Sequence, residues 1–325
     1  MPARILDGRA VARAIRSEVA AEVARMIAAG QAAPGLAAVQ VGDDVASSTY
    51  VRAKMAACRE VGIRPLPHHL PAKASQAELL ALVRVLSASD DVDGILVQMP
   101  LPKQIEARAI LEAVDPARDV DGFHPLNVGR LWSGDAGWTP CTPLGVIELL
   151  DRSGIGIEGA EAVVLGRSNI VGKPMAALLA RRHATVTICH SRTRDLARVT
   201  SRADLLVVAI GIPAFVTDAF VKPGAVVIDV GISRVSDPAL VSEWFAGDAE
   251  RLEGVRRRGY TLIGDTHPSQ MLQRASAWSP VPGGVGPLTV ALLLRNTLQA
   301  AQARRAGSRS HASPHVPPYV PPYVP

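Results

Sequence analysis

Four side chains in the first half of the chain could move protons and hold a polar heterocycle. Tyr50 and Lys54 lie four residues apart in STYVRAKMAACREVG, a helical pattern that puts both on one face. A partly desolvated lysine can shift its pKa and transfer protons, which an arginine cannot do. Gln98 ends the apolar run GILVQMP, where its neutral amide could orient a lysine. Asp121 in RDVDGFHP could accept two parallel N–H donors from a heterocycle such as a pterin. Taken singly, each residue also fits an ordinary structural role, so only their combination indicates a site.

The segment GRSNIVGKP, residues 166–174, indicates a phosphate-binding turn between a strand and a helix. A triphosphate P-loop has four residues between its first glycine and its Gly-Lys pair, and Ser or Thr follows. Here five residues separate Gly166 from Gly172, and Pro174 stands where the hydroxyl would be. The context instead favours a dinucleotide, whose pyrophosphate would meet free N–H groups at the helix start. Ser168 occupies the place usually taken by the second glycine of the dinucleotide fingerprint.

The residues after the next strand favour NADP over NAD. An NAD-specific protein places an acid about 20 residues after the loop, where it holds the ribose 2′-hydroxyl. Here that strand ends in CHSR, residues 189–192, which contains no acid, and Arg167 lies in the loop itself. A histidine, the Ser191 hydroxyl and an arginine suit a 2′-phosphate. The alternative that Arg167 and Arg192 are solvated surface residues stays open at this point.

These residues would be positioned by alternating strands and helices, the pattern of parallel sheets covered by helices. Strands are predicted at residues 36–42, 94–100, 162–166, 184–191, 204–211 and 225–231. Helices are predicted after a short N-terminal strand or turn, at residues 48–62, from Pro174 onward and over GPLTVALLLRNTLQAAQ. The strands of the second series are apolar on both faces, as strands between two helix layers must be. A loop-rich connection at about residues 115–145 is the predicted domain junction. We therefore predict an α/β protein of two domains with a cleft between them.

The composition is that of a soluble globular protein, with 48% apolar and 20% charged residues in a chain of 325. The longest apolar runs are too short to span a bilayer, and the N-terminal segment lacks the apolar region of a secretory signal. We therefore expect a cytoplasmic protein without a membrane partner. The net charge is +5, but Arg304, Arg305 and Arg309 lie in the last 25 residues, which contain no acid, so the rest carries +2. No clustered basic face indicates nucleic-acid binding.

The cysteines argue against a metal site, and the C-terminal tail argues against ordered structure at that end of the sequence. Cys58, Cys141 and Cys189 form no metal-spaced pair, which argues against a metal site and favours small buried side chains. The tail is rich in proline and repeats VPPY, so we expect disorder over residues 304–325.

Six sequence blocks together resemble the bifunctional methylenetetrahydrofolate dehydrogenase/methenyltetrahydrofolate cyclohydrolase family. They are YVRAK, GILVQMPLP, DVDGFHPLN, PCTPLG, GRSNIVGKP and PVPGGVGPLTV, and the resemblance runs in register from ILDG near the start to about residue 300. It implies oxidation of 5,10-methylenetetrahydrofolate with NADP and hydrolysis of the methenyl product to 10-formyltetrahydrofolate. It also implies a homodimer and a folate pocket in the cleft.

The resemblance implies a domain arrangement and a set of site residues. Residues 1–120 with 280–303 would form the small α/β catalytic and folate-binding domain, and residues 140–279 a Rossmann-like NADP-binding domain. By position, the catalytic lysine is Lys54, with Tyr50 and Gln98 as partners and Asp121 as the folate anchor. The implied cofactor contacts are Gly166, Arg167, Ser168, Ser191 and the backbone of Ile232, and the implied substrate loop includes Pro282, Gly283 and Gly284.

Several features depart from the family pattern. Met99 replaces a more usual leucine, IGDTHPS differs from the common run, and the segment at residues 237–260 is longer than usual. Two alternatives compete with the bifunctional enzyme. A shikimate-type NADP oxidoreductase would explain GRSNIVGKP but not QMPLP or PGGVGP. A folate- or nucleotide-binding protein without catalysis is disfavoured by the combination of Tyr50, Lys54, Gln98 and Asp121.

Overall fold

The computed structural model describes residues 2–307, which form two compact units. One unit, here called the sheet unit, comprises residues 2–12 and 142–289. The other, here called the lysine unit because it contains Lys54, comprises residues 13–141 and 290–307. Both units have parallel sheets with helices, so the α/β prediction is confirmed.

The sheet unit is built on six parallel strands in the order β1-β11-β8-β7-β5-β6. In chain order the strands are β1 (Arg4–Ile5), β5 (Glu161–Leu165), β6 (Thr185–Cys189), β7 (Leu205–Val208), β8 (Val226–Asp229) and β11 (Ala277–Ser279). Its helices are α6 (Cys141–Arg152), α7 (Gly172–Arg181), α8 (Leu196–Thr200), α11 (Pro268–Arg274) and the 3-10 turn η1 (Asp218–Phe220). The central strands β5, β7 and β8 are buried, as apolar parallel strands must be.

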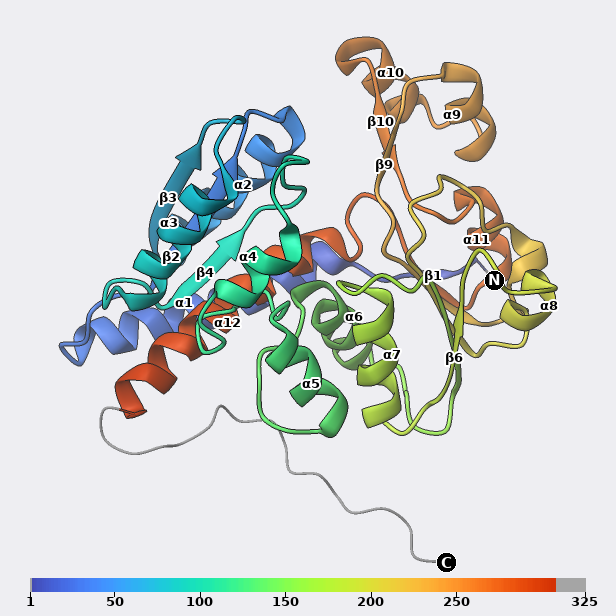
Figure 1. Ribbon diagram of the computed structural model, residues 1–325. Coiled ribbons are helices and arrows are strands. Elements are labelled where there is room, and N and C mark those ends of the chain that lie inside the picture. Colours follow the sequence, from blue (N-terminus) through green and yellow to red (C-terminus); the bar gives the residue numbers. More distant parts are fainter. Residues whose placement is uncertain (1, 308–325) are drawn as a thin grey trace, which may run out of the picture. The chain divides into compact units, whose positions relative to one another are not determined.

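A small extension grows out of the sheet unit between β8 and β11. Strands β9 (Ser233–Val235) and β10 (Thr261–Ile263) pair antiparallel, and α9 (Pro238–Trp244) and α10 (Ala249–Arg258) lie at the end of this ribbon (Figure 1). Its own apolar cluster includes Val241, Val255 and Ile263, with Phe245 packed against it. The segment that is long for the family is therefore a folded element.

The lysine unit contains the parallel sheet β3-β2-β4, formed by β2 (Gly35–Val41), β3 (Arg64–Leu70) and β4 (Gly94–Val97). Its helices include α2 (Val45–Glu60), α3 (Gln76–Ala88), α4 (Ala107–Ala113) and α5 (Pro125–Ser133). Helices α1 (Gly8–Ala28) and α12 (Gly286–Gly307) each contribute residues to both units. Ser75 and Glu78 form a capping box that fixes the start of α3.

Two predictions about elements were wrong. The connection predicted to be loop-rich at about residues 115–145 does contain long loop segments, together with α5 and the start of α6. Strand β6 is an edge strand, so Thr185, Thr187 and Ile188 are exposed rather than buried on both faces. The predicted disorder begins too early, because α12 continues to Gly307 and Arg304 donates a hydrogen bond to Asp93 at 2.8 Å. The VPPY repeats lie outside the described residues.

None of the helices within residues 2–307 is long and apolar enough to cross a bilayer.

The bounds of the sheet unit and the lysine unit also differ from those of the predicted domains. Residues 2–12 join the sheet unit because β1 pairs with β11, and residues 280–289 follow β11 in the same unit.

Candidate functional site

Lys54 and Gln98 come together in the lysine unit. Helix α2 carries Lys54, and Gln98 directly follows β4, whose carboxyl end is where parallel sheets present ligand-binding groups. The Lys54 Nζ donates to Gln98 Oε1 at 3.1 Å, while Gln98 Nε2 donates to the Met99 carbonyl at 2.7 Å. The second bond fixes the amide so that its oxygen faces the lysine. Lys54 is half-buried and therefore has an ammonium group that a bound molecule can still reach.

Asp121 lies near Lys54 and in contact with Cys141. Burial raises the pKa of Asp121, an effect opposed by the positive charge of Lys54 and by a hydrogen bond from the Cys141 thiol. The pKa of Cys141 is raised well above its ordinary value, first by burial and then by the charge of Asp121, so the thiol stays protonated and can donate. Asn296 of α12 donates at 2.8 Å to the carbonyl of Val120, the residue before Asp121.

A second carboxylate holds the loop that presents Asp121. Asp119 is 4% exposed and accepts hydrogen bonds from the backbone of Phe123 at 3.1 Å and His124 at 2.8 Å, and from Asn127 Nδ2 at 2.8 Å. These bonds close the turn that contains Asp121 and start α5. Burial raises the pKa of Asp119 to about 6, against the effect of its three donors. The sequence analysis missed Asp119; its place in RDVDGFHP was the available signal.

Tyr50 lies one turn before Lys54 on α2 and is 46% exposed. An exposed aromatic ring beside a reachable lysine offers a flat apolar surface for a ring system. The structure thus brings Lys54, Gln98 and Asp121 together and leaves Tyr50 open at the surface of the same helix.

The three cysteines are free and buried, as expected from the sequence. Within residues 2–307 no group of three His, Cys, Asp or Glu side chains could hold a metal ion.

In the sheet unit, the GRSNIVGKP loop joins β5 to α7 and requires both of its glycines. Gly166 has a φ of 130°, and a Cβ there would collide with the Ala209 carbonyl oxygen at the end of β7. A Cβ at Gly172 would collide with the Gly166 carbonyl oxygen. The loop can therefore pass closely over the carboxyl ends of the strands, which is the geometry that lets a backbone approach a pyrophosphate.

The polar groups of this loop fit a dinucleotide rather than a triphosphate. Ser168 Oγ accepts from the backbone of Val171 at 3.1 Å and Gly172 at 3.3 Å and so fixes the helix start. The Lys173 ammonium donates to the Asn169 side chain of the loop, at 2.7 Å from Oδ1, so a ligand phosphate would have to compete with that bond. The backbone N–H groups of residues 167–170 donate no hydrogen bond within the described chain, and Arg167 is exposed. Anion-binding donors are thus free at this turn.

The remaining predicted cofactor residues also follow carboxyl ends of the six-stranded sheet. Ser191 follows β6 and is exposed, and Ile232 follows β8 and is 48% exposed. Ile170 after β5 and Ile212 after β7 are 44% and 48% exposed, and the sequence analysis missed both. Exposed isoleucines thus follow three neighbouring strands, β5, β7 and β8, and could contact the flat rings of a nucleotide.

The predicted substrate loop follows β11 at the same sheet edge. Gly283 has a φ of 110°, and its carbonyl accepts from the Arg9 backbone at 3.1 Å. The Gly284 N–H donates to the Pro280 carbonyl at 2.8 Å. A Cβ at Gly8 would collide with the Gly284 carbonyl, so the start of α1 packs directly on this loop.

Two buried acids, which the sequence analysis also missed, hold the loops at the carboxyl ends of these strands. Asp229 accepts from Thr266 Oγ1 at 2.6 Å and from the backbone of Gly231, Asp265 and Thr266. Burial raises its pKa to about 7. Asp265 accepts from the backbone of Ile210 and Gly211 through Oδ2, and burial raises its pKa as well. These acids fix the strand-end loops that carry Ile212 and Ile232.

Comparison with known proteins covers nearly the whole chain. Residues 6–121 match the family model of the tetrahydrofolate dehydrogenase/cyclohydrolase catalytic domain, and residues 140–305 match that of the corresponding NAD(P)-binding domain. The bifunctional protein FolD of Koribacter versatilis is 54% identical over 95% of this chain and 100% of its own length. That of Magnetococcus marinus is 50% identical over 92% of this chain and 98% of its own.

Solved structures agree with these matches. The bifunctional FolD methylenetetrahydrofolate dehydrogenase/cyclohydrolase of Campylobacter jejuni superimposes with a TM-score of 0.84 at 42% identity, covering 92% of this chain and 99% of that one. The Trypanosoma brucei methylenetetrahydrofolate dehydrogenase-cyclohydrolase, solved with NADP and an inhibitor, gives a TM-score of 0.84 at 39% identity over 94% of this chain and 99% of its own. The chain therefore belongs to the tetrahydrofolate dehydrogenase/cyclohydrolase family of bifunctional, NADP-dependent enzymes.

Proposed function

We propose that Lys54, Gln98, Asp121 and Tyr50 are the catalytic and folate-binding residues of the two reactions that define this family. The observation that carries the proposal is the hydrogen bond of 3.1 Å between Lys54 Nζ and Gln98 Oε1, beside the carboxyl of Asp121. In support of the proposal, an amine that can transfer protons, a neutral amide that can orient it and a carboxyl that could accept from a pterin lie in one folded unit.

The cofactor contacts follow the same reasoning. Gly166, Ser168 and the free N–H groups of their loop would hold the pyrophosphate of NADP, and Arg167 with Ser191 would hold its 2′-phosphate. The backbone of Ile232 and the Pro282–Gly284 loop would lie along the nicotinamide and substrate. In support of this assignment, all these segments follow strands of one parallel sheet.

In the first reaction, the methylene carbon that bridges two folate nitrogens becomes a methenyl carbon. NADP, when bound, would supply the acceptor for the hydride that leaves this carbon. A nitrogen lone pair of the substrate stabilises the resulting cation, so this step needs alignment more than an acid or base. Asp121 would hold the pterin N–H groups, and Tyr50 would position the ring system.

In the second reaction, water adds to the methenyl carbon and the ring opens to 10-formyltetrahydrofolate. The attacking water loses a proton as its oxygen bonds to carbon. The carbon–nitrogen bond on the pterin side then breaks, its electron pair stays on nitrogen, and that nitrogen takes a proton. The hydroxyl on the former methenyl carbon releases its own proton to solvent as the formyl carbonyl forms, so one proton is released overall. Lys54 would accept the first proton from water and supply the one that nitrogen takes, with Gln98 orienting its amine.

Substitution of Lys54 by methionine tests this division of labour. Because only the second reaction moves protons, Lys54→Met should lower the cyclohydrolase rate at least about 100-fold and the dehydrogenase rate much less. NADPH formation and decay of the methenyl absorbance measure the two rates in one assay. Lys54→Arg keeps the charge but cannot act as a base, so it should behave like Lys54→Met.

The exposed Lys73, in the same unit, provides a matched control in Lys73→Met. Equal loss of both activities in Lys54→Met, at unchanged folate affinity, would contradict the proposed roles. Absence of NADPH from the unmodified protein with methylenetetrahydrofolate and NADP would instead favour a folate-binding protein without catalysis.

We also propose that the enzyme is a cytoplasmic homodimer, with residues 1–120 and 280–303 serving folate and residues 140–279 serving NADP. The family resemblance supports the dimer, and the apolar runs too short for a membrane support the location. Sedimentation equilibrium measures the mass in solution, and a monomer at micromolar concentration would overturn the dimer.

A further inference from the structure

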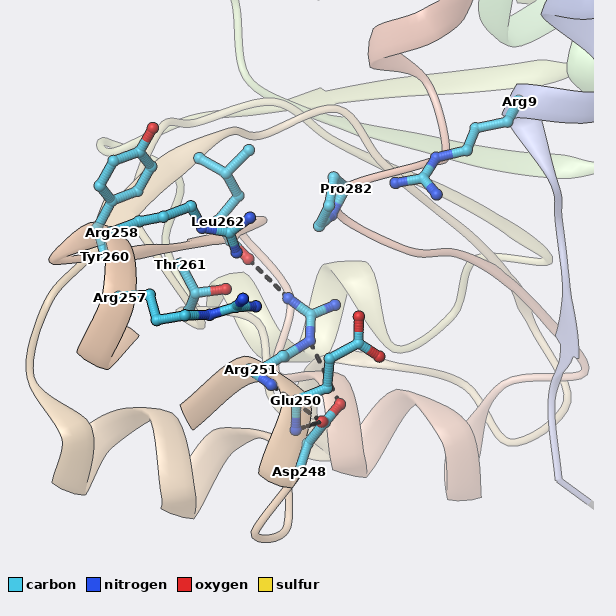
Figure 2. A pocket seen from close by; sticks show the side chains of 10 residues that line it. All are labelled: Arg9, Asp248, Glu250, Arg251, Arg257, Arg258, Tyr260, Thr261, Leu262 and Pro282. Atoms are coloured by element: carbon cyan, nitrogen blue, oxygen red, sulfur yellow. Dashed lines mark hydrogen bonds and ion pairs between the residues drawn. The ribbon is translucent and has the colours of Figure 1, made fainter. Parts of the chain in front are cut away.

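A pocket lined by arginines lies between the extension and the substrate loop of the sheet unit (Figure 2). Its cavity volume is about 460 Å³. The lining residues are Arg9, Asp248, Glu250, Arg251, Arg257, Arg258, Tyr260, Thr261, Leu262 and Pro282. Four arginines face two acids, so the lining carries a net positive charge and favours an anionic ligand.

One arginine is a fixed part of the pocket wall. Arg251 donates to the carbonyls of Leu262 at 2.9 Å and Val281 at 3.2 Å, and its guanidinium lies 3.9 Å from the centre of the Phe245 ring. Asp248 is also committed, because its carboxylate accepts from the first N–H groups of α10 and pairs with Arg251 at 3.6 Å. Several contacts thus hold Arg251 in the wall, and its pair with Asp248 cancels one acidic and one basic charge of the lining, which leaves Arg9, Arg257 and Arg258 against Glu250.

The other arginines keep donors available. Within the described residues, the guanidinium groups of Arg9 and Arg258 make no hydrogen bond or ion pair, and Arg257 has only an exposed partner, Glu253, at 3.7 Å. In Figure 2, Arg251, Arg257 and Arg258 extend from one side of the cavity, and Arg9 stands on the other side of Pro282. Guanidinium forks of this kind bind carboxylates well.

Pro282 connects this pocket to the proposed reaction, since it belongs both to the pocket lining and to the loop assigned to the substrate. A folate ends in glutamate, and longer forms carry a chain of γ-linked glutamates, in which each residue keeps a free α-carboxylate and the last also keeps its γ-carboxylate. We propose that the arginine pocket binds the carboxylates of this tail and so selects folates with several glutamates. This inference rests on the proposed function, because it assumes that a folate is the substrate.

The test compares tail lengths in wild type and in the double variant Arg257→Gln/Arg258→Gln. Wild type should show a KM for the pentaglutamate substrate about tenfold below that for the monoglutamate, as two exposed ion pairs would give. The double variant should lose this ratio while keeping kcat and the KM for the monoglutamate. Raising the salt should also shrink the wild-type ratio.

The matched control is Arg256→Gln/Arg202→Gln, which removes the same charge from the same unit. Arg256 belongs to α10 but does not line the pocket, and Arg202 is an exposed partner of Glu161. The control should keep the tail-length ratio. An unchanged ratio in the pocket variant would overturn the proposal.

Calorimetry separates this inference from the proposed function, since it needs no catalysis. Tetra-γ-glutamate alone should bind wild type and the control but not Arg257→Gln/Arg258→Gln. If inorganic phosphate binds as tightly as tetra-γ-glutamate and tail length leaves KM unchanged, the pocket is a site for a free anion and the proposal fails. If wild type binds tetra-γ-glutamate but shows no activity on any folate, the result contradicts the proposed function and still supports the site for the glutamate tail.

Discussion

Two basic residues of the GRSNIVGKP loop have different surroundings despite their proximity in the sequence. The Lys173 ammonium is held by Asn169, whereas Arg167 is exposed at the turn where backbone N–H groups are free. An available guanidinium beside free donors can bind a 2′-phosphate, and a committed ammonium cannot do so without breaking a hydrogen bond. We infer that Arg167 alone determines the preference for the phosphorylated cofactor within this loop.

Arg167→Ala should therefore weaken NADP binding about 10- to 100-fold, the cost of losing one charge-assisted contact. NAD has no 2′-phosphate, so its Kd should change less than about threefold. Fluorescence titration with both reduced cofactors measures the two constants. Lys173→Ala is the matched control and should leave their ratio unchanged. A similar loss for both cofactors would show that Arg167 does not read the 2′-phosphate.

The two acids of the DVDG turn have different hydrogen-bond partners. The carboxylate of Asp119 accepts from three donors of its own loop, while Asp121 has the Cys141 thiol beside it and Lys54 nearby. Sequence reasoning singled out Asp121 as a possible acceptor for a heterocycle, a role that the family resemblance also implies, and overlooked Asp119. Composition does not distinguish two aspartates two residues apart; their hydrogen-bond partners do.

At the scale of elements, α12 supports the Asp121 turn through one buried amide. Asn296 is 2% exposed, and its Nδ2 donates to the Val120 carbonyl at 2.8 Å, the peptide that leads into Asp121. The Cys141 Sγ, at the start of α6, lies 3.4 Å from the same carbonyl. Two helices thus fix the backbone on which the proposed pterin anchor depends.

Asn296→Ala should lower the free energy of unfolding by about 1–3 kcal/mol and raise the KM for the folate, because the Val120 carbonyl loses its stronger donor. NADP affinity should stay unchanged. Thr297→Ala is the matched control: this neighbour is fully buried, but its hydroxyl bonds only within α12, to the Leu293 carbonyl at 2.8 Å. If both variants lose stability while neither changes the folate KM, α12 has no positioning role.

Most elements near the site could be predicted from sequence because apolar parallel strands stand out as continuous runs. Strand β3 could not, because RPLPHHL has few apolar residues and contains two prolines, which an edge strand tolerates. Strand β6 was predicted correctly as a strand but wrongly as buried, since its sequence does not reveal that it ends the sheet. The arginine pocket assembles Arg9, Pro282 and α10 from distant segments, so only tertiary structure reveals it.

At the scale of the whole molecule, each unit contains a buried acid whose pKa is raised. Asp119 in the lysine unit has a pKa of about 6 and Asp229 in the sheet unit one of about 7, against an ordinary value of 3.8. Both are raised mainly by burial, which disfavours the charged form. The folded protein therefore binds these two protons more tightly than the unfolded chain does.

This difference gives stability a definite pH dependence. The stability that the bound protons contribute is fully present below pH 3.8 and is lost as pH rises through about 6 and then about 7. From pH 5 to pH 8 the two acids should together lower the free energy of unfolding by roughly 4 kcal/mol. Urea unfolding followed by circular dichroism at pH 5, 6, 7 and 8 measures the change. Asp119→Asn and Asp229→Asn should each flatten the profile, Asp229→Asn more strongly above pH 6, while the exposed Asp218→Asn should leave its slope unchanged. If the Asp229 variant does not fold, Asp119→Asn alone still tests the prediction. A pH dependence of its free energy of unfolding equal to that of wild type would show that Asp119 is already ionised at pH 5.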